Sequence, residues 1–173
     1  MQFYVIYLSQ LQIRLSHFKH YIFLHITTTW KWNPHYSKDR CLLERIQHRF
    51  TRMFPHLRSL PNEDRLCQLG LWSLEERRNR ADLIELFKMI KGLSATPWSR
   101  FFMKAEDTST RGHTYKLAKK HSRCDTRLYF FPQRVVNRWN SLSQEDVDAQ
   151  SVNCFKSRLE KKCTRQMDFF KDS

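Results

Sequence analysis

The sequence has little glycine: only Gly70, Gly92 and Gly112 occur in 173 residues. All-β folds normally use more glycine, because tight hairpin turns need residues that accept a positive φ angle. A glycine-rich loop that cradles phosphate is disfavoured for the same reason. The scarcity of glycine therefore favours helices joined by short polar loops.

Sequence signatures of catalysis and metal binding are also missing. No two aspartates are adjacent, and two-metal phosphoryl chemistry needs clustered carboxylates. The chain has no HExxH, Walker or GxSxG motif. His113, His121 and Cys124 lie near one another but lack a fourth ligand at zinc-site spacing. We therefore predict that the chain is not an enzyme and has no metal, cofactor or small-molecule substrate.

The chain lacks the marks of secretion and of a membrane span. Its five cysteines are odd in number, no two have CxxC spacing, and no Asn-x-Ser/Thr acceptor occurs. This favours an intracellular, reducing compartment, either nuclear or cytoplasmic. A spanning helix needs about 20 mostly apolar residues, whereas basic residues and histidines between Arg14 and His20 interrupt the apolar residues of segment 1–30. We expect no membrane-spanning helix.

Aromatic residues and positive charge are abundant. Hydrophobic residues make up 40% of the chain and aromatic residues 14%, which supplies enough apolar surface for a modest core. There are 31 Lys and Arg against 17 Asp and Glu, a net charge of +14. A surplus of this size attracts polyanions. Nucleic acid is the first candidate partner and an anionic membrane surface, reached through segment 1–30, is the second.

The spacing of apolar residues predicts a mainly α fold. We expect one small irregular helical domain at 31–163 with a basic loop-rich segment, a poorly ordered N-terminal arm at 1–30 and a frayed tail at 164–173. A capping box, Ser73 with Glu76, predicts the start of one helix. Weak alternation at 114–117 indicates a short strand. The expected helices span 38–54, 61–69, 74–91, 132–141 and 151–162.

The first expected helix carries two stripes of side chains. Its N-cap is Ser37, and its core-facing stripe consists of Leu42, Ile46, Phe50 and Met53. A second stripe beside it consists of Arg45, Arg49 and Arg52. The arginine stripe fits either of two roles, a solvated polar face or a phosphate-contacting face.

Half of the net charge lies in residues 100–139, which hold ten basic and three acidic residues with aromatic residues among them. Cations bind phosphates, and flat rings can stack on unpaired bases. For Phe130, Phe131 and Trp139 a place in the core is the favoured role. The candidate nucleic-acid contacts are Arg45, Arg49, Arg52, Arg111, Lys116, Lys119, Lys120, Arg123, Arg127, Arg134 and Arg138.

Several short segments occur in an order that resembles one protein family. They are WNP at 32–34, LLERIQHRFTR at 42–52, RLCQLGLWSLEERR at 65–78, DLIELFK at 82–88, TRGH at 110–113, FFPQRVVNRWNSL at 130–142 and SVNCFKSRL at 151–159. Each segment is common by itself, but their order and spacing together are specific. They resemble the region that follows the polymerase core in jockey-like non-LTR (LINE-type) retrotransposon reverse transcriptases, which are RNA-directed DNA polymerases.

The resemblance implies a truncated, non-catalytic remnant. It covers about residues 30–163, and the endonuclease domain and the polymerase aspartates of the family have no counterpart in this chain. What the resemblance implies is a helical element that handles RNA or DNA, with a reverse transcriptase polymerase domain as a further candidate partner. The alternatives are a structural or non-functional fragment that packs on the missing polymerase domain, and a membrane-surface protein.

Overall fold

The computed structural model describes residues 13, 16–17, 34, 36–105, 112–121, 124, 129–165 and 169–170. These residues are mainly helical, as expected, and they contain no named strand. Almost all of the predicted N-terminal arm lies outside the described residues. The chain divides into two compact units, residues 1–78 and 79–173. Each unit is described by itself.

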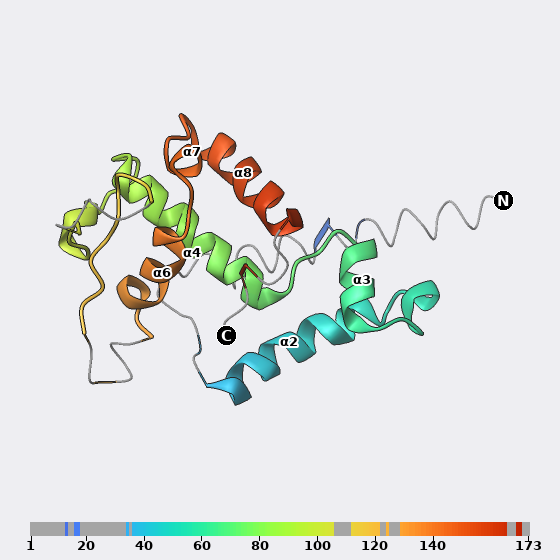
Figure 1. Cartoon of the computed structure of the whole chain (residues 1–173). Coiled ribbons are helices and arrows are strands. Elements are labelled where there is room, and N and C mark those ends of the chain that lie inside the picture. Colours follow the sequence, from blue (N-terminus) through green and yellow to red (C-terminus); the bar gives the residue numbers. More distant parts are fainter. Residues whose placement is uncertain are drawn as a thin grey trace. The chain divides into compact units, whose positions relative to one another are not determined.

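In the first unit a long helix and a short helix enclose a small apolar cluster. Helix α2 spans Ser37–Thr51, the 3-10 turn η1 spans Pro55–Leu57, and α3 spans Asn62–Gln68 (Figure 1). Phe54 and Leu57 are buried there. Helix α2 ends at Thr51, three residues before the expected end, and Pro55 begins η1. The partly buried side chains that pack on this cluster are those of Phe50, Leu60 and Leu69.

The orientation of α2 corrects the prediction of its core-facing stripe. Leu42, Ile46 and Met53 are exposed, whereas Gln47 and Thr51 are buried. The reason is polar: the Gln47 amide donates a 2.8 Å hydrogen bond to the Trp72 carbonyl, and a buried polar side chain needs such a partner. The predicted N-cap is also wrong, because Tyr36 occupies that position without a side-chain cap.

Helix α4, Leu74–Ile90, begins at the predicted capping box. The Glu76 amide donates to the Ser73 hydroxyl over 3.2 Å, and the Ser73 amide donates to the Glu76 carboxylate over 3.1 Å. A carboxylate from α2 completes this start: Glu44 Oε1 accepts the Glu75 amide at 3.0 Å. Burial raises the Glu44 pKa, although the backbone hydrogen bond opposes that effect. The beginning of α4 is thus fixed by both local and tertiary hydrogen bonds.

The second unit has a conventional apolar core. It contains the rest of α4, the 3-10 turn η2 (Trp98–Arg100), α6 (Phe131–Asn140), α7 (Gln144–Val147) and α8 (Val152–Arg165) (Figure 1). Phe87 of α4 stacks on Phe155 of α8, with ring centroids 4.3 Å apart. Phe131 and Trp139 of α6 are fully buried. The core positions favoured for these two residues are confirmed.

Two smaller expectations in the second unit differ from the structure. Residues 114–117 form no strand; one antiparallel bridge joins Leu117 to Lys104. Phe170, within the predicted frayed tail, is buried, and its carbonyl accepts a 2.7 Å hydrogen bond from Asn79. An aromatic ring near the chain end can anchor a segment that polar neighbours alone would leave loose.

Candidate nucleic-acid interface

A short segment of the second unit, which we call the lysine loop (residues 112–121), is held at its centre and exposed at its end. The Asn140 side chain binds both backbone groups of Leu117, accepting its amide at 2.9 Å and donating to its carbonyl at 2.8 Å. The Trp139 indole donates to the Tyr115 carbonyl over 2.8 Å. Since Leu117 is itself buried, the loop is anchored to α6 along one side.

The anchoring leaves the following side chains in solvent. Lys119 and Lys120 are exposed beyond the anchor, and Lys104 is exposed on the segment that pairs with the loop. The Tyr115 ring is 42% exposed, although its carbonyl is bonded to Trp139. Two hydrogen bonds hold the paired segments together, from the Ala105 amide to Lys116 and from the Ala118 amide to Met103. Cations and a flat ring therefore occur together on a fixed backbone.

Lys116 differs from its neighbours because its side chain folds back over Gly112. A Cβ atom added at Gly112 would lie 2.2 Å from Lys116 Cε, and Gly112 has a φ of +144°. Only glycine accommodates this backbone angle and this close approach together. Lys116 is half-buried as a result. It is a weaker candidate for phosphate contact than Lys119 and Lys120.

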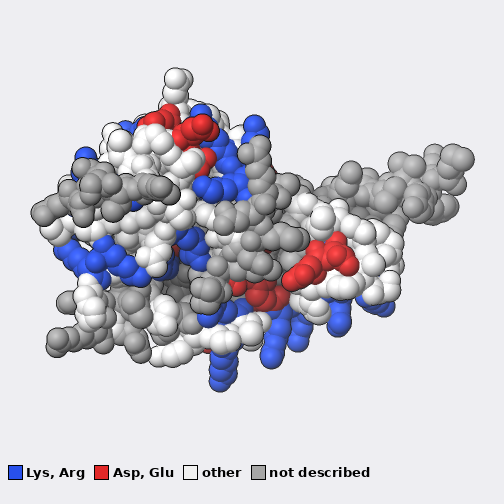
Figure 2. Space-filling model, in the orientation of Figure 1, with Lys and Arg blue, Asp and Glu red and all other residues white. Residues whose placement is uncertain are grey.

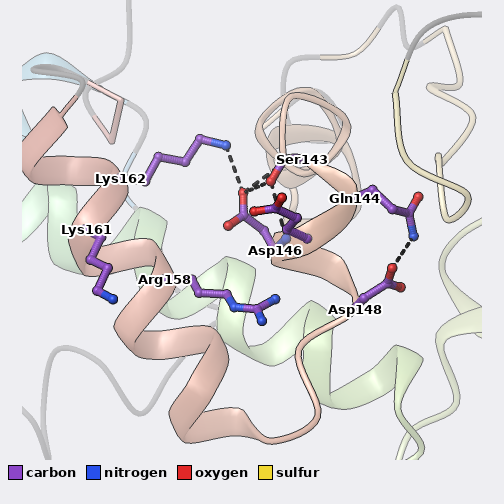
Figure 3. Close-up of a pocket in the computed structure, with 8 residues that line it drawn as sticks. Ser143, Gln144, Asp146, Asp148, Arg158, Lys161 and Lys162 are labelled. Atoms are coloured by element: carbon purple, nitrogen blue, oxygen red, sulfur yellow. Dashed lines mark hydrogen bonds and ion pairs between the residues drawn. The ribbon is translucent and has the colours of Figure 1, made fainter.

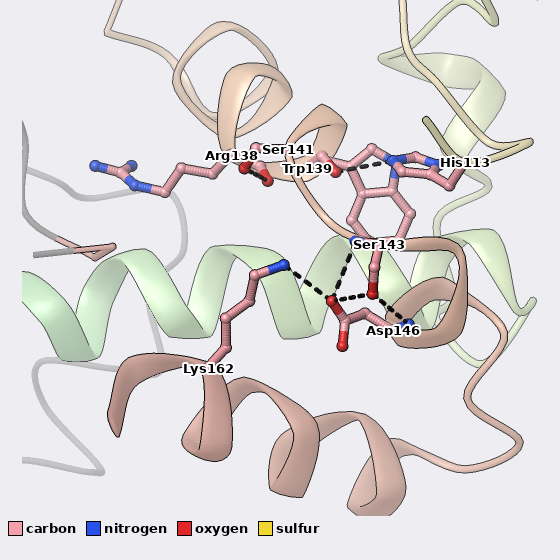
Figure 4. Close-up of polar contacts among 7 residues, drawn as sticks. All are labelled: His113, Arg138, Trp139, Ser141, Ser143, Asp146 and Lys162. Atoms are coloured by element: carbon pink, nitrogen blue, oxygen red, sulfur yellow. Dashed lines mark hydrogen bonds and ion pairs between the residues drawn. The ribbon is translucent and has the colours of Figure 1, made fainter. Parts of the chain in front are cut away.

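His113 fastens the beginning of the lysine loop (Figure 4). Its Nε2 donates to the Trp139 carbonyl over 2.9 Å, and its Nδ1 accepts the Tyr115 amide at 3.2 Å. Both ring nitrogens are used in the neutral form, and a proton on Nδ1 would remove the acceptor. Burial lowers the His113 pKa, with repulsion from Lys116 adding to it and the Trp139 hydrogen bond opposing it.

Arg134, one of the predicted nucleic-acid contacts, forms an ion pair within the second unit. Its Nε and Nη2 donate to the two carboxylate oxygens of Asp82 over 2.6 and 2.9 Å, and its Nη1 donates to the Tyr129 carbonyl. The Asp82 side chain is only 4% exposed. A buried carboxylate needs a paired cation. The structure therefore gives Arg134 an internal ion pair in the second unit, and its contact with nucleic acid stays a prediction.

The other predicted contacts fall into three groups. Arg138 is half-buried, and its side chain points away from the polar cluster around His113 and Ser143 (Figure 4). Arg45, Arg49 and Arg52 are all exposed on α2 or at its end. Figure 2 shows basic side chains projecting in a row over α2. Arg111, Arg123 and Arg127 lie outside the described residues.

The positive charge around α2 affects the pKa of His48, a histidine on this helix. Desolvation lowers the pKa of His48, and repulsion from Arg65 and Arg52 lowers it further. Arg65 is buried and donates to the Leu60 carbonyl and the Asn62 side chain, so it shapes the loop rather than facing solvent. One buried and one exposed arginine thus both contribute to the lowered pKa of His48.

The aromatic residues near α6 divide between core and surface. Phe131 and Trp139 are buried, as favoured from the sequence. Phe130 is 44% exposed and Tyr129 is 43% exposed, so the core position favoured for Phe130 is wrong. Phe130 is the N-cap of α6, and its ring centroid lies 6.5 Å from that of Phe101 in an edge-on contact. Two exposed rings therefore lie at the start of α6.

A polar pocket of about 760 Å³ between α7 and α8 was missed by sequence reasoning (Figure 3). Asp146 receives hydrogen bonds from the Ser143 hydroxyl and from Lys162, at 2.8 and 3.0 Å. Burial raises the Asp146 pKa, but these hydrogen bonds outweigh burial and the net shift is downward. Arg158 extends from α8 toward α7 (Figure 3). Three basic and three acidic side chains line this pocket, so its charge favours neither sign of ligand.

Among the described residues no three His, Cys, Asp or Glu side chains form a group that could hold a metal ion. No helix there has the length and apolar character of a membrane span. Cys41, Cys67, Cys124 and Cys154 form no disulfide bond.

Comparison with known proteins adds no relative. No protein-family model matches the chain, and no curated protein or solved structure matches it either. A function for this chain is therefore inferred from the geometry of each unit and from the sequence.

Proposed function

We propose that this chain is a non-catalytic nucleic-acid-binding protein that contacts single-stranded RNA or DNA through the lysine loop. The observation that supports it is the exposure of Lys119, Lys120 and Tyr115 on a backbone anchored by Asn140 and Trp139. Lysines bind phosphates as point charges, and an exposed ring can stack on an unpaired base. Anchoring before binding reduces the ordering entropy that binding must overcome.

Two further observations support the proposal. The net charge of +14 raises the local concentration of any polyanion near the protein. The order of sequence segments resembles the region after the polymerase core in non-LTR retrotransposon reverse transcriptases, where RNA and DNA are handled. Within this proposal the chain is a remnant of such a protein that acts in the nucleus or cytoplasm.

The salt dependence of RNA binding tests the proposal. Fluorescence anisotropy with a labelled uridine 20-mer would give the affinity of the full chain at several salt concentrations. Each phosphate contact contributes a slope of about −0.7 for a single strand. We expect the triple variant Lys104→Gln/Lys119→Gln/Lys120→Gln to reduce the slope by about two units.

A matched control separates the lysine loop from total charge. The variant Arg58→Gln/Lys91→Gln/Lys161→Gln removes the same charge from exposed positions elsewhere, and its slope should stay close to that of the parent protein. Tyr115→Ala should weaken binding to the single strand about fivefold or more through lost stacking, with little effect on a duplex. Equal effects of the two triple variants would show that charge alone, and not this loop, attracts RNA.

A further inference from the structure

One face of α2 is apolar and basic at the same time. Leu42 and Ile46 are 58% and 49% exposed on the helix, and Met53, just past its end, is 52% exposed. Arg45 and Arg49 lie beside them, since residues three and four apart share one side of a helix, and Arg52 follows. We call this set, Leu42, Arg45, Ile46, Arg49, Arg52 and Met53, the α2 outer face.

Polar contacts fix this orientation of the helix. On the opposite side Gln47 binds the Trp72 carbonyl at 2.8 Å and Glu44 accepts the Glu75 amide at 3.0 Å. Arg40 forms an ion pair with Glu75 at 3.3 Å. A rotation that buried Leu42 and Ile46 would break all three contacts and leave buried polar groups without partners. The first unit therefore holds the α2 outer face in solvent.

Nucleic acid does not account for the composition of this face. Arginines suit phosphates, but Leu42, Ile46 and Met53 have no flat ring to stack on a base, and phosphate contacts would leave them in water. Interfaces with nucleic acid are polar and strongly positive. Exposed aliphatic side chains in a contiguous group are typical of protein–protein contacts.

The charges then select among protein partners. A second copy would bring Arg45 and Arg49 against the same residues of its neighbour, which is repulsive. Segment 1–30 contains no acid, so charge does not favour it either. We propose that the α2 outer face binds an acidic amphipathic helix of another protein, with apolar side chains of that helix over Leu42 and Ile46 and its carboxylates on Arg45 and Arg49. The acidic helix would thus pack along the apolar side of α2, with ion pairs at its edge.

A synthetic peptide probe tests this proposal on the full chain. The probe is a labelled helical peptide with leucines at i, i+3, i+4 and i+7 and glutamates elsewhere; its isomer has the same composition with dispersed leucines. Fluorescence anisotropy should show binding of the first peptide and much weaker binding of the isomer. Leu42→Ser/Ile46→Ser should weaken peptide binding about tenfold or more, as for central interface residues, while leaving RNA affinity unchanged.

Matched variants separate the contribution of the arginines to peptide binding from that of the apolar side chains. Arg45→Gln/Arg49→Gln should weaken peptide binding most at low salt, because salt screens exposed charges. Leu93→Ser, at a leucine 62% exposed in the second unit, should leave peptide binding unchanged. Circular dichroism should show the same helix content in every variant, since all these positions are exposed.

Three results would overturn the proposal. One is peptide binding that Leu42→Ser/Ile46→Ser does not change. Another is a loss of RNA affinity in that apolar variant comparable to the loss in Arg45→Gln/Arg49→Gln, which would assign the face to nucleic acid. The third is a dimer in sedimentation that Ile46→Ser converts to a monomer, which would make a second copy the occupant. Since the RNA assay of the lysine loop uses other residues, failure of one proposal leaves the other testable.

Discussion

Helices α2 and α6 bury opposite kinds of side chain. Helix α6 buries Phe131, Val135, Val136 and Trp139, an entirely apolar set. Helix α2 buries Gln47 and Thr51 and leaves Leu42 and Ile46 exposed. The first arrangement is stabilised by apolar area removed from water, whereas the second is stabilised by hydrogen bonds and an ion pair to the beginning of α4.

The difference indicates which surface of each helix remains available to another molecule. A helix that buries its apolar face has none left for a partner, so α6 can contact other molecules only through its polar side and the lysine loop that it anchors. A helix held by polar contacts keeps its apolar face for a partner. Substitutions of single residues in α2, in α6 and in the loop anchored to α6 can test this difference.

The largest effect is expected from Phe131→Ala on the buried face of α6. Phe131 is fully buried and meets Phe102 edge-on at 5.7 Å. Truncation should lower the free energy of unfolding by about 3–5 kcal/mol, because it removes apolar contact and leaves a cavity. Urea denaturation followed by circular dichroism measures it. Phe130→Ala, at the exposed neighbouring ring, is the control and should change stability by about 0.5 kcal/mol or less.

Gln47→Ala should have the next largest effect. The Gln47 side chain is 1% exposed and donates to the Trp72 carbonyl. Its removal breaks this hydrogen bond of a buried side chain, which costs about 1–3 kcal/mol. The control is Gln68→Ala at an exposed position of α3, measured in the same urea titration. If the two variants were equally stable, polar contacts would not hold α2 in its orientation.

The sequence determined the helices better than their orientation. Periodicity located α4 and α6, and the capping box at Ser73 marked a true helix start. The same periodicity misassigned α2, because a hydrophobic stripe identifies a face without saying what covers it. Gln47 is buried through a carbonyl 25 residues away, and a contact at that separation leaves no local pattern.

The candidate nucleic-acid contacts could be predicted only in part, again because long-range contacts leave no local sequence pattern. Lys119 and Lys120 were identified as cations outside helices, and both are exposed. Arg134 had the same chemical type and the same local density of charge, but Asp82, 52 residues earlier, pairs with it. Composition counts cations, whereas tertiary contacts determine which of them face solvent.

Acid should loosen the second unit through His113. Its folded pKa is lowered, so below the unfolded value of about 6.5 the unfolded chain binds more protons and stability falls as pH falls. We expect a lower melting temperature at pH 5.5 than at pH 7.5. His113→Gln should weaken this dependence, whereas His56→Gln, at an exposed position of the first unit, should not. A pH dependence that persists in full without His113 would contradict the assignment.

The smallest effect on stability is expected at Ile46, although the sequence pattern predicts that this residue faces the core. A serine in place of a core isoleucine would be strongly destabilising, yet Ile46 is 49% exposed and makes none of the polar contacts that hold α2. Ile46→Ser should change the free energy of unfolding by about 0.5 kcal/mol or less, and Val135→Ser on the buried face of α6 should change it several times more. A large loss at Ile46 would mean that this face is already covered within the folded chain. A negligible loss would leave an external partner as the reason for its apolar side chains.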